Sequence, residues 1–250
     1  MDGDELIERA LSTDFEGWDF SVLSGRLTEG DPDWDYETSA AEAVATAEAV
    51  LDMGTGGGEF LARLLPAPGR VTATESYPPN VPVARRRLEP LGVEVVATDA
   101  DRDDVLPFED ARFDLVLNRH ESFDAREVAR ILRPGGVFLT QQVGGGDLSE
   151  LNAALGGPAN PYGDWNLDAA AGLVAEAGLT VTTRREAFPP GRFTDVGAVV
   201  LYLRMAPWQI DGWDPAAHRD RLSALHDRMT ADGGLAVRHH RFLVVARKPD

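Results

Sequence analysis

A glycine-rich run at residues 52–58 constrains the fold of this chain more than any other feature. The run reads Asp-Met-Gly-Thr-Gly-Gly-Gly and follows the end of a short apolar stretch at residues 49–51. Apolar residues return at helical spacing between residues 60 and 65. A strand, a glycine turn and a helix in this order form a nucleotide cradle, because glycine lets the backbone approach a ligand and the helix N-terminus offers unpaired N–H groups.

The glycine spacing discriminates between two kinds of cofactor. A dinucleotide fingerprint G-x-G-x-x-G requires a glycine where this chain has Glu59, and Gly58 stands one place too early. The pattern is instead D-x-G-x-G-x-G, starting at Asp52. Lys248 is the only lysine, so the chain also lacks the Tyr-x-x-x-Lys pair of one oxidoreductase class. An NAD-dependent oxidoreductase is therefore disfavoured.

Four further elements follow the glycine run in a fixed order. Residues 71–75 read as a strand ending in Glu75, whose carboxylate suits both hydroxyls of a ribose. Residues 93–100 form a third predicted strand, which reaches Asp99 near its end, and residues 113–117 a fourth. Residues 128–139 then predict a helix, a proline-glycine turn and a fifth strand.

In these elements the chain resembles the class I S-adenosylmethionine (SAM) dependent methyltransferases. The resemblance implies an α/β fold, a three-layer doubly wound seven-stranded sheet with N-terminal and inserted helical lid segments. It implies SAM as cofactor and S-adenosylhomocysteine as product, with Asp99 receiving the adenine amino group. The cofactor-binding residues predicted on this basis are Asp52, Gly54, Thr55, Gly56, Gly58, Glu75, Ser76, Asp99, Ala100 and Asn118.

The chain length and the absence of a low-complexity linker predict a single domain over residues 1–250. Within it we expect an N-terminal lid (1–47), a SAM-binding core (48–143), a second half with substrate-cap insertions (144–235) and a final strand (236–250). The lid includes a predicted helix at residues 40–49. The apolar run at 195–208 fits a strand or a helix, and Asp195 as a cap with Pro207 as terminator favours a helix.

Substrate-binding residues are predicted on three segments. Trp34 and Tyr36 lie just before the glycine cradle, in the acidic and aromatic N-terminal part. Gln141 and Gln142 lie at the carboxyl end of the fifth predicted strand, where ligands of open α/β sheets bind. Alternation along a strand turns one amide toward substrate and the other toward a structural hydrogen bond. Trp208 is the last residue of the apolar segment at 195–208.

His120 and Glu121 are the predicted catalytic residues. They follow the fourth predicted strand, where the resemblance places catalytic or substrate-binding groups. Imidazole suits proton removal at neutral pH, and Glu121 is placed to orient it or to bind a cationic substrate. A structural role for His120 remains the alternative. The remaining histidines form no ligand constellation, and no metal is predicted.

The formal charge of −18 limits the partners. Affinity for nucleic acid comes largely from Lys and Arg contacts to phosphate, and this chain lacks a basic patch beyond short arginine groups such as residues 85–87. Nucleic acid is therefore disfavoured. The sequence has no membrane-length apolar stretch and an acidic start, which predicts a cytoplasmic protein without membrane contact. We expect a monomer or a homodimer.

The predicted function is methyl transfer from SAM to an oxygen or nitrogen of a small molecule by in-line displacement. The alternatives are an RNA or protein methyltransferase and a non-catalytic SAM-binding protein. The sulfonium already activates the methyl group, so alignment of the acceptor and exclusion of water can supply most of the catalysis. For that reason the chain carries few diagnostic catalytic groups, and the acceptor cannot be read from it.

Overall fold

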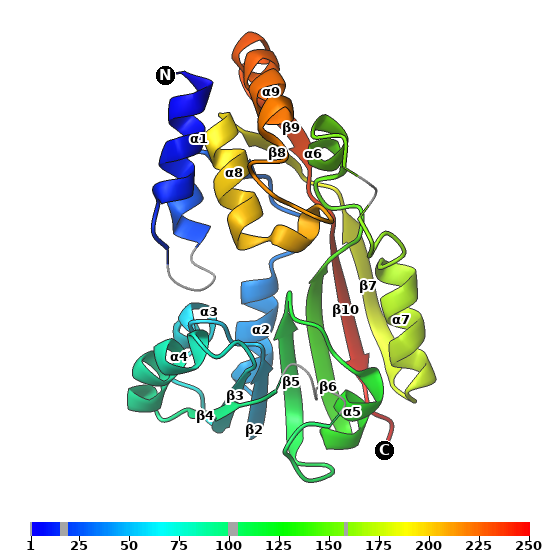
Figure 1. The fold of residues 1–250 in the computed structure, drawn as a ribbon. Helices are drawn as coiled ribbons and strands as arrows, with labels where there is room; N and C mark the ends of the chain where they lie inside the picture. The colour runs from blue at the N-terminus through cyan, green and yellow to red at the C-terminus, as the bar shows by residue number, and fades with distance from the viewer. Residues whose placement is uncertain (1, 16–19, 100–104, 158–159) are drawn as a thin grey trace. The chain divides into compact units, whose positions relative to one another are not determined.

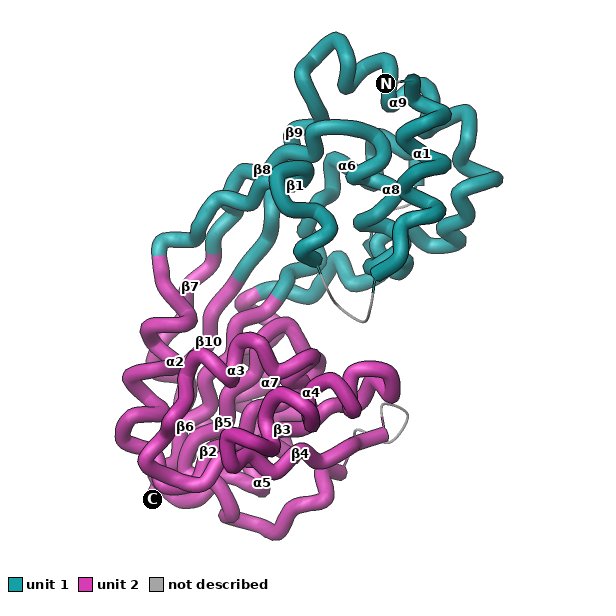
Figure 2. Tube along the Cα trace, turned by 90° about the vertical axis from the view of Figure 1, so that its left-hand side faces the viewer, with its two compact units in different colours: residues 1–33, 143–166, 187–241 teal, residues 34–142, 167–186, 242–250 magenta. Residues whose placement is uncertain are grey.

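The computed structural model describes residues 2–15, 20–99, 105–157 and 160–250. The chain divides into two compact units, each assembled from three segments (Figure 2). Unit 1 comprises Met1–Asp33, Val143–Asn166 and Ala187–Arg241, and unit 2 comprises Trp34–Gln142, Leu167–Glu186 and Phe242–Asp250. The single domain with its lid and cap segments stays a prediction.

Unit 2 is built on a seven-stranded sheet with the strand order β4-β3-β2-β5-β6-β10-β7 (Figure 1). Its strands are β2 (Ala49–Met53), β3 (Arg70–Glu75), β4 (Glu94–Ala97), β5 (Phe113–Arg119), β6 (Leu132–Val143), β7 (Thr180–Ala187) and β10 (Arg241–Arg247). The helices are α2 (Tyr36–Val44), α3 (Glu59–Arg63), α4 (Asn80–Leu88), α5 (Ala125–Ile131) and α7 (Leu167–Glu176). The α/β fold with a helix-flanked seven-stranded sheet is thereby confirmed.

The neighbouring strands β4, β3, β2, β5 and β6 all pair in parallel. Strand β2 is buried at every position, as expected of a strand in a parallel sheet that is covered on both faces. From α5, Val128 and Ile131 pack with Val174 of α7 in one hydrophobic core with residues of the sheet. The parallel arrangement brings the carboxyl ends of these strands, and the residues that follow them, to one edge.

Both ends of α5 are satisfied by side chains. Asp124 caps its start, since one carboxylate oxygen accepts hydrogen bonds from the Arg126 and Glu127 backbone N–H groups at 2.7 and 3.0 Å. After its end, the Lys248 ammonium donates to the carbonyls of Ala129 and Leu132 at 2.7 and 2.8 Å. The single lysine therefore ties the C-terminal segment to the end of this helix.

Unit 1 has its own core around an apolar helix. It contains α1 (Gly3–Ser12), β1 (Leu27–Glu29), α6 (Ser149–Ala154), β8 (Pro190–Phe193), α8 (Val196–Met205), α9 (Arg219–Asp232) and β9 (Leu235–Arg238). Strands β1, β8 and β9 form a separate three-stranded sheet. Most of α8 is buried, and the Asp195 carboxylate caps it by accepting from the Ala198 N–H at 3.0 Å. The helix predicted within residues 195–208 is confirmed.

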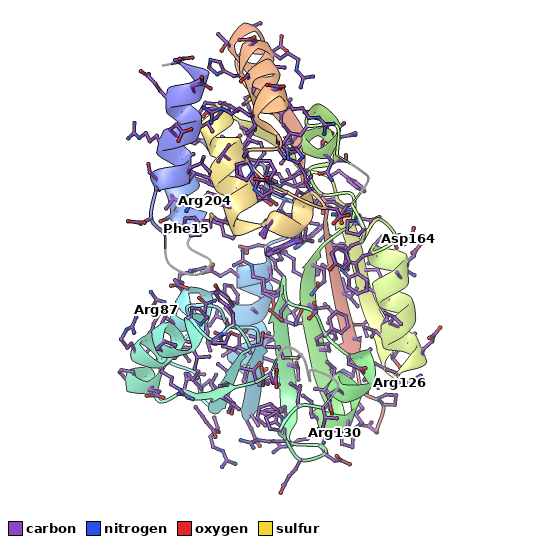
Figure 3. The ribbon with its side chains drawn as sticks, in the orientation of Figure 1. Phe15, Arg87, Arg126, Arg130, Asp164 and Arg204 are labelled. Atoms are coloured by element: carbon purple, nitrogen blue, oxygen red, sulfur yellow. The ribbon has the colours of Figure 1, made fainter. Side chains whose placement is uncertain are left out.

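Arg204 shows how α8 is fastened to the segment after α1 inside unit 1 (Figure 3). Its guanidinium lies 4.9 Å from the ring centroid of Phe15 and donates to the Thr13 carbonyl at 2.8 Å. An arginine that stacks on an aromatic ring and caps a carbonyl contributes through packing as well as charge.

Two elements differ from their predicted bounds. Helix α2 spans Tyr36–Val44 instead of residues 40–49, because the Asp35 carboxylate caps it at the Thr38 N–H (3.1 Å) and β2 already begins at Ala49. The predicted final strand at 236–250 is two strands, with β9 in unit 1 and only β10 in the large sheet. Between them the His240 N–H donates to the Asp147 carboxylate at 2.8 Å and so leaves the ladder.

None of the helices in the described part of the chain combines the length and apolar composition required to cross a bilayer.

Candidate functional site

The glycine cradle connects β2 to α3 and is anchored to β3. Gly54, Gly56 and Gly58 have φ angles of +67°, +62° and +80°, and residues with a Cβ rarely adopt such positive values. The Gly54 N–H donates to the Thr74 hydroxyl at 3.3 Å and the Thr55 N–H to the Thr74 carbonyl at 2.9 Å. The conformation of the loop is thus fixed by the positive φ angles of its glycines and by hydrogen bonds to the neighbouring strand.

The three glycines serve different purposes. A Cβ on Gly54 would lie 2.4 Å from Cγ of Glu121, and a Cβ on Gly58 would lie 2.7 Å from the Leu88 side chain of α4. Both positions therefore need glycine for close packing within unit 2. A Cβ on Gly56 would meet nothing within 4 Å. Gly56 is the glycine of the cradle whose backbone borders open space.

A cavity of about 260 Å³ lies at the carboxyl ends of the parallel strands. Met53, Gly54, Thr74 and Ser76 line it from β2, β3 and the residues that follow them. Thr98 and Leu106 contribute from beyond β4, and Glu121, Ser122, Phe123, Asp124 and Glu127 from between β5 and α5. This is the position at which α/β sheets bind ligands.

Two buried carboxylates lie at the end of β2 and β3. Asp52 is 3% exposed and Glu75 is 4% exposed. Burial raises the pKa of Asp52 to about 7, although Thr55 and Arg119 oppose the shift. Burial also raises the pKa of Glu75, although the backbone N–H groups of the following turn, including Tyr77 at 2.7 Å, bind its carboxylate. In the described part of the chain, neither carboxylate forms an ion pair with arginine or lysine.

The remaining predicted cofactor residues fall into three groups. Ser76 lines the cavity, and Thr55 is buried in the cradle. Asn118 is completely buried, and its amide oxygen accepts from the Thr140 hydroxyl at 2.8 Å and from Gln142 Nε2 at 2.5 Å. Asp99 is exposed just beyond β4, next to the cavity residue Thr98. Ala100 lies outside the described residues.

The predicted catalytic residues occupy the turn after β5. Glu121 lines the cavity and packs against Gly54. His120 is exposed and has a φ of +64°, which is unusual for a residue with a side chain. Its N–H donates to the Gln141 carbonyl at 2.8 Å, and its Nε2 lies 3.1 Å from Gln141 Nε2. The two residues therefore lie side by side at the edge of the sheet.

The predicted substrate residues separate between the two units. In unit 2, the Trp34 indole donates to Gln141 Oε1 at 2.7 Å, and the Tyr36 hydroxyl donates to the Asn118 carbonyl at 3.1 Å. Gln142 makes structural bonds to Asn118, Thr140 and the Glu121 carbonyl. Tyr36 is buried and does not line the cavity formed by the described residues. Trp208 is exposed in unit 1.

Sequence reasoning did not identify several cavity residues as part of the site, of which Glu127 is the most informative. Its Oε2 accepts from the Leu106 N–H at 3.0 Å, and it pairs with Arg130, which Figure 3 labels. The carboxylate thereby ties the wall of the cavity to the first turn of α5. The spacing of Asp124 and Glu127 is a capping pattern, D-x-x-E, and this pattern was the signal available in the sequence.

The site combines a glycine cradle with two buried carboxylates, Asp52 and Glu75, at the ligand-binding edge of an α/β unit. Comparison with known proteins shows what part of the chain is similar to. A family model described as a methyltransferase domain matches residues 50–136. A fatty-acid O-methyltransferase of Mycolicibacterium smegmatis is 40% identical over 114 residues, which are 42% of this chain and 40% of that protein. The chain thus spans less than half the length of that relative.

Solved structures share the fold at low sequence identity. The YcgJ protein of Bacillus subtilis superimposes with a TM-score of 0.60 at 18% identity, covering 86% of this chain and 98% of that one. A SAM-dependent methyltransferase of Aquifex aeolicus superimposes with a TM-score of 0.52 at 16% identity, covering 99% and 98%. Residues 50–136 thus match a methyltransferase domain, and the chain shares its fold with a structure of a methyltransferase that depends on S-adenosyl-L-methionine (SAM).

The residues present fit this cofactor. SAM carries a sulfonium and an ammonium group, so it would bring positive charge to Asp52 and Glu75, whose pKa values burial raises, a shift that Arg119 only partly offsets at Asp52. Glu75 also offers carboxylate oxygens to a ribose diol, and Gly56 borders open space. Within the described ranges, histidines and carboxylates form no cluster suited to a metal ion.

Proposed function

We propose that this chain transfers the methyl group of SAM to an oxygen or nitrogen of a small-molecule acceptor. The observation that carries the proposal is the pair of buried carboxylates, Asp52 and Glu75, beside a cavity that opens at the glycine cradle. A buried carboxylate without a cationic partner favours a ligand that supplies the cation. A neutral or anionic nucleotide would gain much less from this pair.

Bound SAM would supply a methyl group that its sulfonium has already activated for displacement. Glu75 and the cradle would hold the ribose and fix the direction of the methyl group, and Asp52 would balance the positive charge. His120 and Glu121, in the turn after β5, are the proposed groups that contact the acceptor. Their part is to orient the acceptor and to exclude water, which in well-aligned systems contributes on the order of 7–11 kcal/mol.

The relatives support a small acceptor. The M. smegmatis relative is named for a fatty acid, and a fatty acid offers a carboxylate oxygen as nucleophile. In the balanced reaction the carboxylate oxygen forms a bond to the methyl carbon while the carbon–sulfur bond breaks and its electron pair stays on sulfur. The products are a methyl ester and S-adenosylhomocysteine, and no proton is released. The acidic surface of this chain also opposes a nucleic-acid substrate.

Calorimetry with SAM, S-adenosylhomocysteine and NAD, at low and high salt, tests the cofactor. We expect both SAM forms to bind and NAD to give no response. Gly56→Val should weaken SAM binding by more than about 100-fold, because a side chain would enter the space that the ligand needs. Gly92→Val is the matched control, since Gly92 has a φ of +85° and equally open surroundings after α4.

Equal loss of SAM binding in both glycine variants would mean that backbone strain, and not the cradle, is responsible. Silence of the folded wild-type protein toward SAM would contradict the proposed function. A screen with radiolabelled SAM then follows, with a long-chain fatty acid first. RNA binding that falls steeply as salt rises would instead favour a nucleic-acid methyltransferase.

A further inference from the structure

Three side chains of unit 2, those of Trp34, Gln141 and His120, are connected in series by hydrogen bonds at the ligand-binding edge of the sheet. The Trp34 indole nitrogen lies 2.7 Å from Gln141 Oε1, and Gln141 Nε2 lies 3.1 Å from His120 Nε2. Trp34 is 9% exposed and Gln141 is 7% exposed, so the first bond is sheltered from water. This hydrogen-bonded series connects the segment before α2, strand β6 and the turn after β5.

The Trp34 indole sets the direction of both hydrogen bonds between Trp34, Gln141 and His120. An indole N–H can donate and cannot accept, so the atom of Gln141 that faces Trp34 must be the carbonyl oxygen. The amide nitrogen therefore faces His120, which fixes an orientation that is otherwise ambiguous for glutamine. An amide NH₂ offers only hydrogens, so His120 Nε2 must accept with its lone pair. The ring hydrogen of a neutral His120 is consequently on Nδ1.

The backbone holds His120 at this place. The His120 N–H donates to the Gln141 carbonyl at 2.8 Å, directly after the register pair Arg119–Gln141 of β5 and β6. The positive φ of His120 costs conformational energy that a glycine or asparagine would avoid. Gln141 thus contacts both the backbone and the ring of the same residue.

We propose that Trp34 and Gln141 are positioning residues that hold His120 in the Nδ1-protonated tautomer, and that His120 therefore meets the methyl acceptor as a hydrogen-bond donor and not as a general base. The second clause rests on the proposed function, whereas the first does not. If His120 took up a proton at Nε2, that hydrogen would face the Gln141 NH₂ group and the hydrogen bond between the two side chains would be lost. A histidine held in this way suits an acceptor that arrives as an anion, such as a carboxylate, which needs orientation and no proton removal.

The tautomer can be measured directly by long-range ¹H–¹⁵N NMR of the imidazole rings, which separates protonated from bare ring nitrogens. The chain has five histidines, and the loss of signals in His120→Asn assigns those of His120. We expect wild-type His120 to carry its hydrogen on Nδ1 with a bare Nε2. The spectra need neither SAM nor acceptor, so this result is independent of whether the protein binds SAM.

Two variants test the origin of the tautomer. In Gln141→Glu one carboxylate oxygen still accepts from Trp34 and the other can only accept from His120, so we expect the hydrogen to move to Nε2. In Trp34→Phe the amide loses its orienting donor, and we expect both tautomers to appear. Trp213→Phe is the control, because Trp213 packs on His218 in unit 1, with ring centroids 5.1 Å apart, and should disturb only His218.

A hydrogen on Nε2 in the wild-type protein would overturn the proposal. So would an unchanged His120 pattern in both Gln141→Glu and Trp34→Phe, provided that their backbone spectra show the native fold. Loss of the fold in one variant leaves the other variant and the wild-type spectrum to decide. If the tautomer is as expected and SAM does not bind, only the proposed function fails.

Discussion

Two sets of buried carboxylates, Asp147 in unit 1 and Asp52 with Glu75 in unit 2, have opposite electrostatic surroundings. In unit 1, Asp147 is 3% exposed and is bound by Arg241 at 2.6 Å, and Arg241 also pairs with Glu29 at 2.7 Å. Arg241 and His239 hold the pKa of Asp147 below its usual value in spite of burial. In unit 2, burial raises the pKa of both Asp52 and Glu75.

This electrostatic difference distinguishes a carboxylate that stabilises the fold from carboxylates that are suited to bind a ligand. A buried carboxylate with its own cation is complete and needs no ligand, so the Asp147 cluster is understood as part of the framework of unit 1. Buried carboxylates without a paired cation are costly, and such groups are typical of sites that bind or react. Unit 2 therefore carries the electrostatic signature of the site.

The histidines of the two units follow the same contrast. His239 is 2% exposed, and Arg241 Nη2 lies 3.2 Å from its Nδ1. His239 Nδ1 also lies 3.6 Å from Asp147 Oδ1, so its ring faces both the arginine and the carboxylate of the cluster. His239 is fixed inside a network of charges, whereas His120 is fixed at an exposed strand end next to cavity residues.

The largest expected effect comes from breaking the compensated cluster. Arg241→Leu should lower the free energy of unfolding by about 3–5 kcal/mol, because Asp147 would stay buried without its cation. Urea denaturation measures this loss. Arg238→Leu is the control, since Arg238 is three residues earlier, exposed, and forms a surface pair with Glu150 worth at most about 1 kcal/mol. Equal losses in the two variants would remove the distinction between the clusters.

A second effect is expected at Glu75, one of the two buried carboxylates of unit 2. Glu75→Gln should weaken SAM binding by about 10- to 100-fold, because hydrogen bonds to a charged group contribute about 1.5–3 kcal/mol. The fold should remain, since glutamine keeps an oxygen for the Tyr77 N–H. Calorimetry measures the affinity, and Glu109→Gln, at an exposed position, provides the control. Native affinity in Glu75→Gln would exclude Glu75 from the binding site.

A further expected effect concerns pH. Because the pKa of Asp52 is raised from 3.8 to about 7, the folded protein holds a proton there that the unfolded chain has released. Its stabilising contribution is complete below pH 3.8 and is lost as the pH rises through about 7. Within that window the unfolding free energy should fall by about 1.4 kcal/mol per pH unit from this group.

Urea unfolding of wild type and Asp52→Asn between pH 5 and 8, without SAM, isolates this contribution. The variant should show a flatter pH dependence than the wild type. Asp168→Asn changes a carboxylate that is 88% exposed and should leave the slope unaltered. Parallel slopes in wild type and Asp52→Asn would mean that Asp52 is already ionised in the folded protein.

The sequence predicted those features whose physical cause is local. The glycine cradle, the carboxylate at the end of β3 and the helix capped by Asp195 each depend on residues within a few positions of one another. The same holds for the alternation of the glutamines, since Gln141 reaches His120 while Gln142 bonds to Asn118. That Gln141 contacts substrate stays a prediction.

Features that depend on distant partners were not accessible from the sequence. Nothing near Trp34 indicates that its partner is Gln141, more than one hundred positions away. The role of Gly58 in packing against Leu88, and of Glu121 in packing against Gly54, likewise follows from tertiary contact and not from spacing. The split of the final strand at His240 depends on Asp147 in the same way.

Lys248 makes this protein unusually suitable for labelling at a single amine side chain. It is the only lysine, so amine-directed labels have one side chain to modify besides the chain terminus. Its ammonium caps the carbonyls of Ala129 and Leu132, between α5 and β6. The rate at which this amine is acylated therefore reports how often the end of α5 opens, and a fluorophore attached there would mark unit 2 at a single known position.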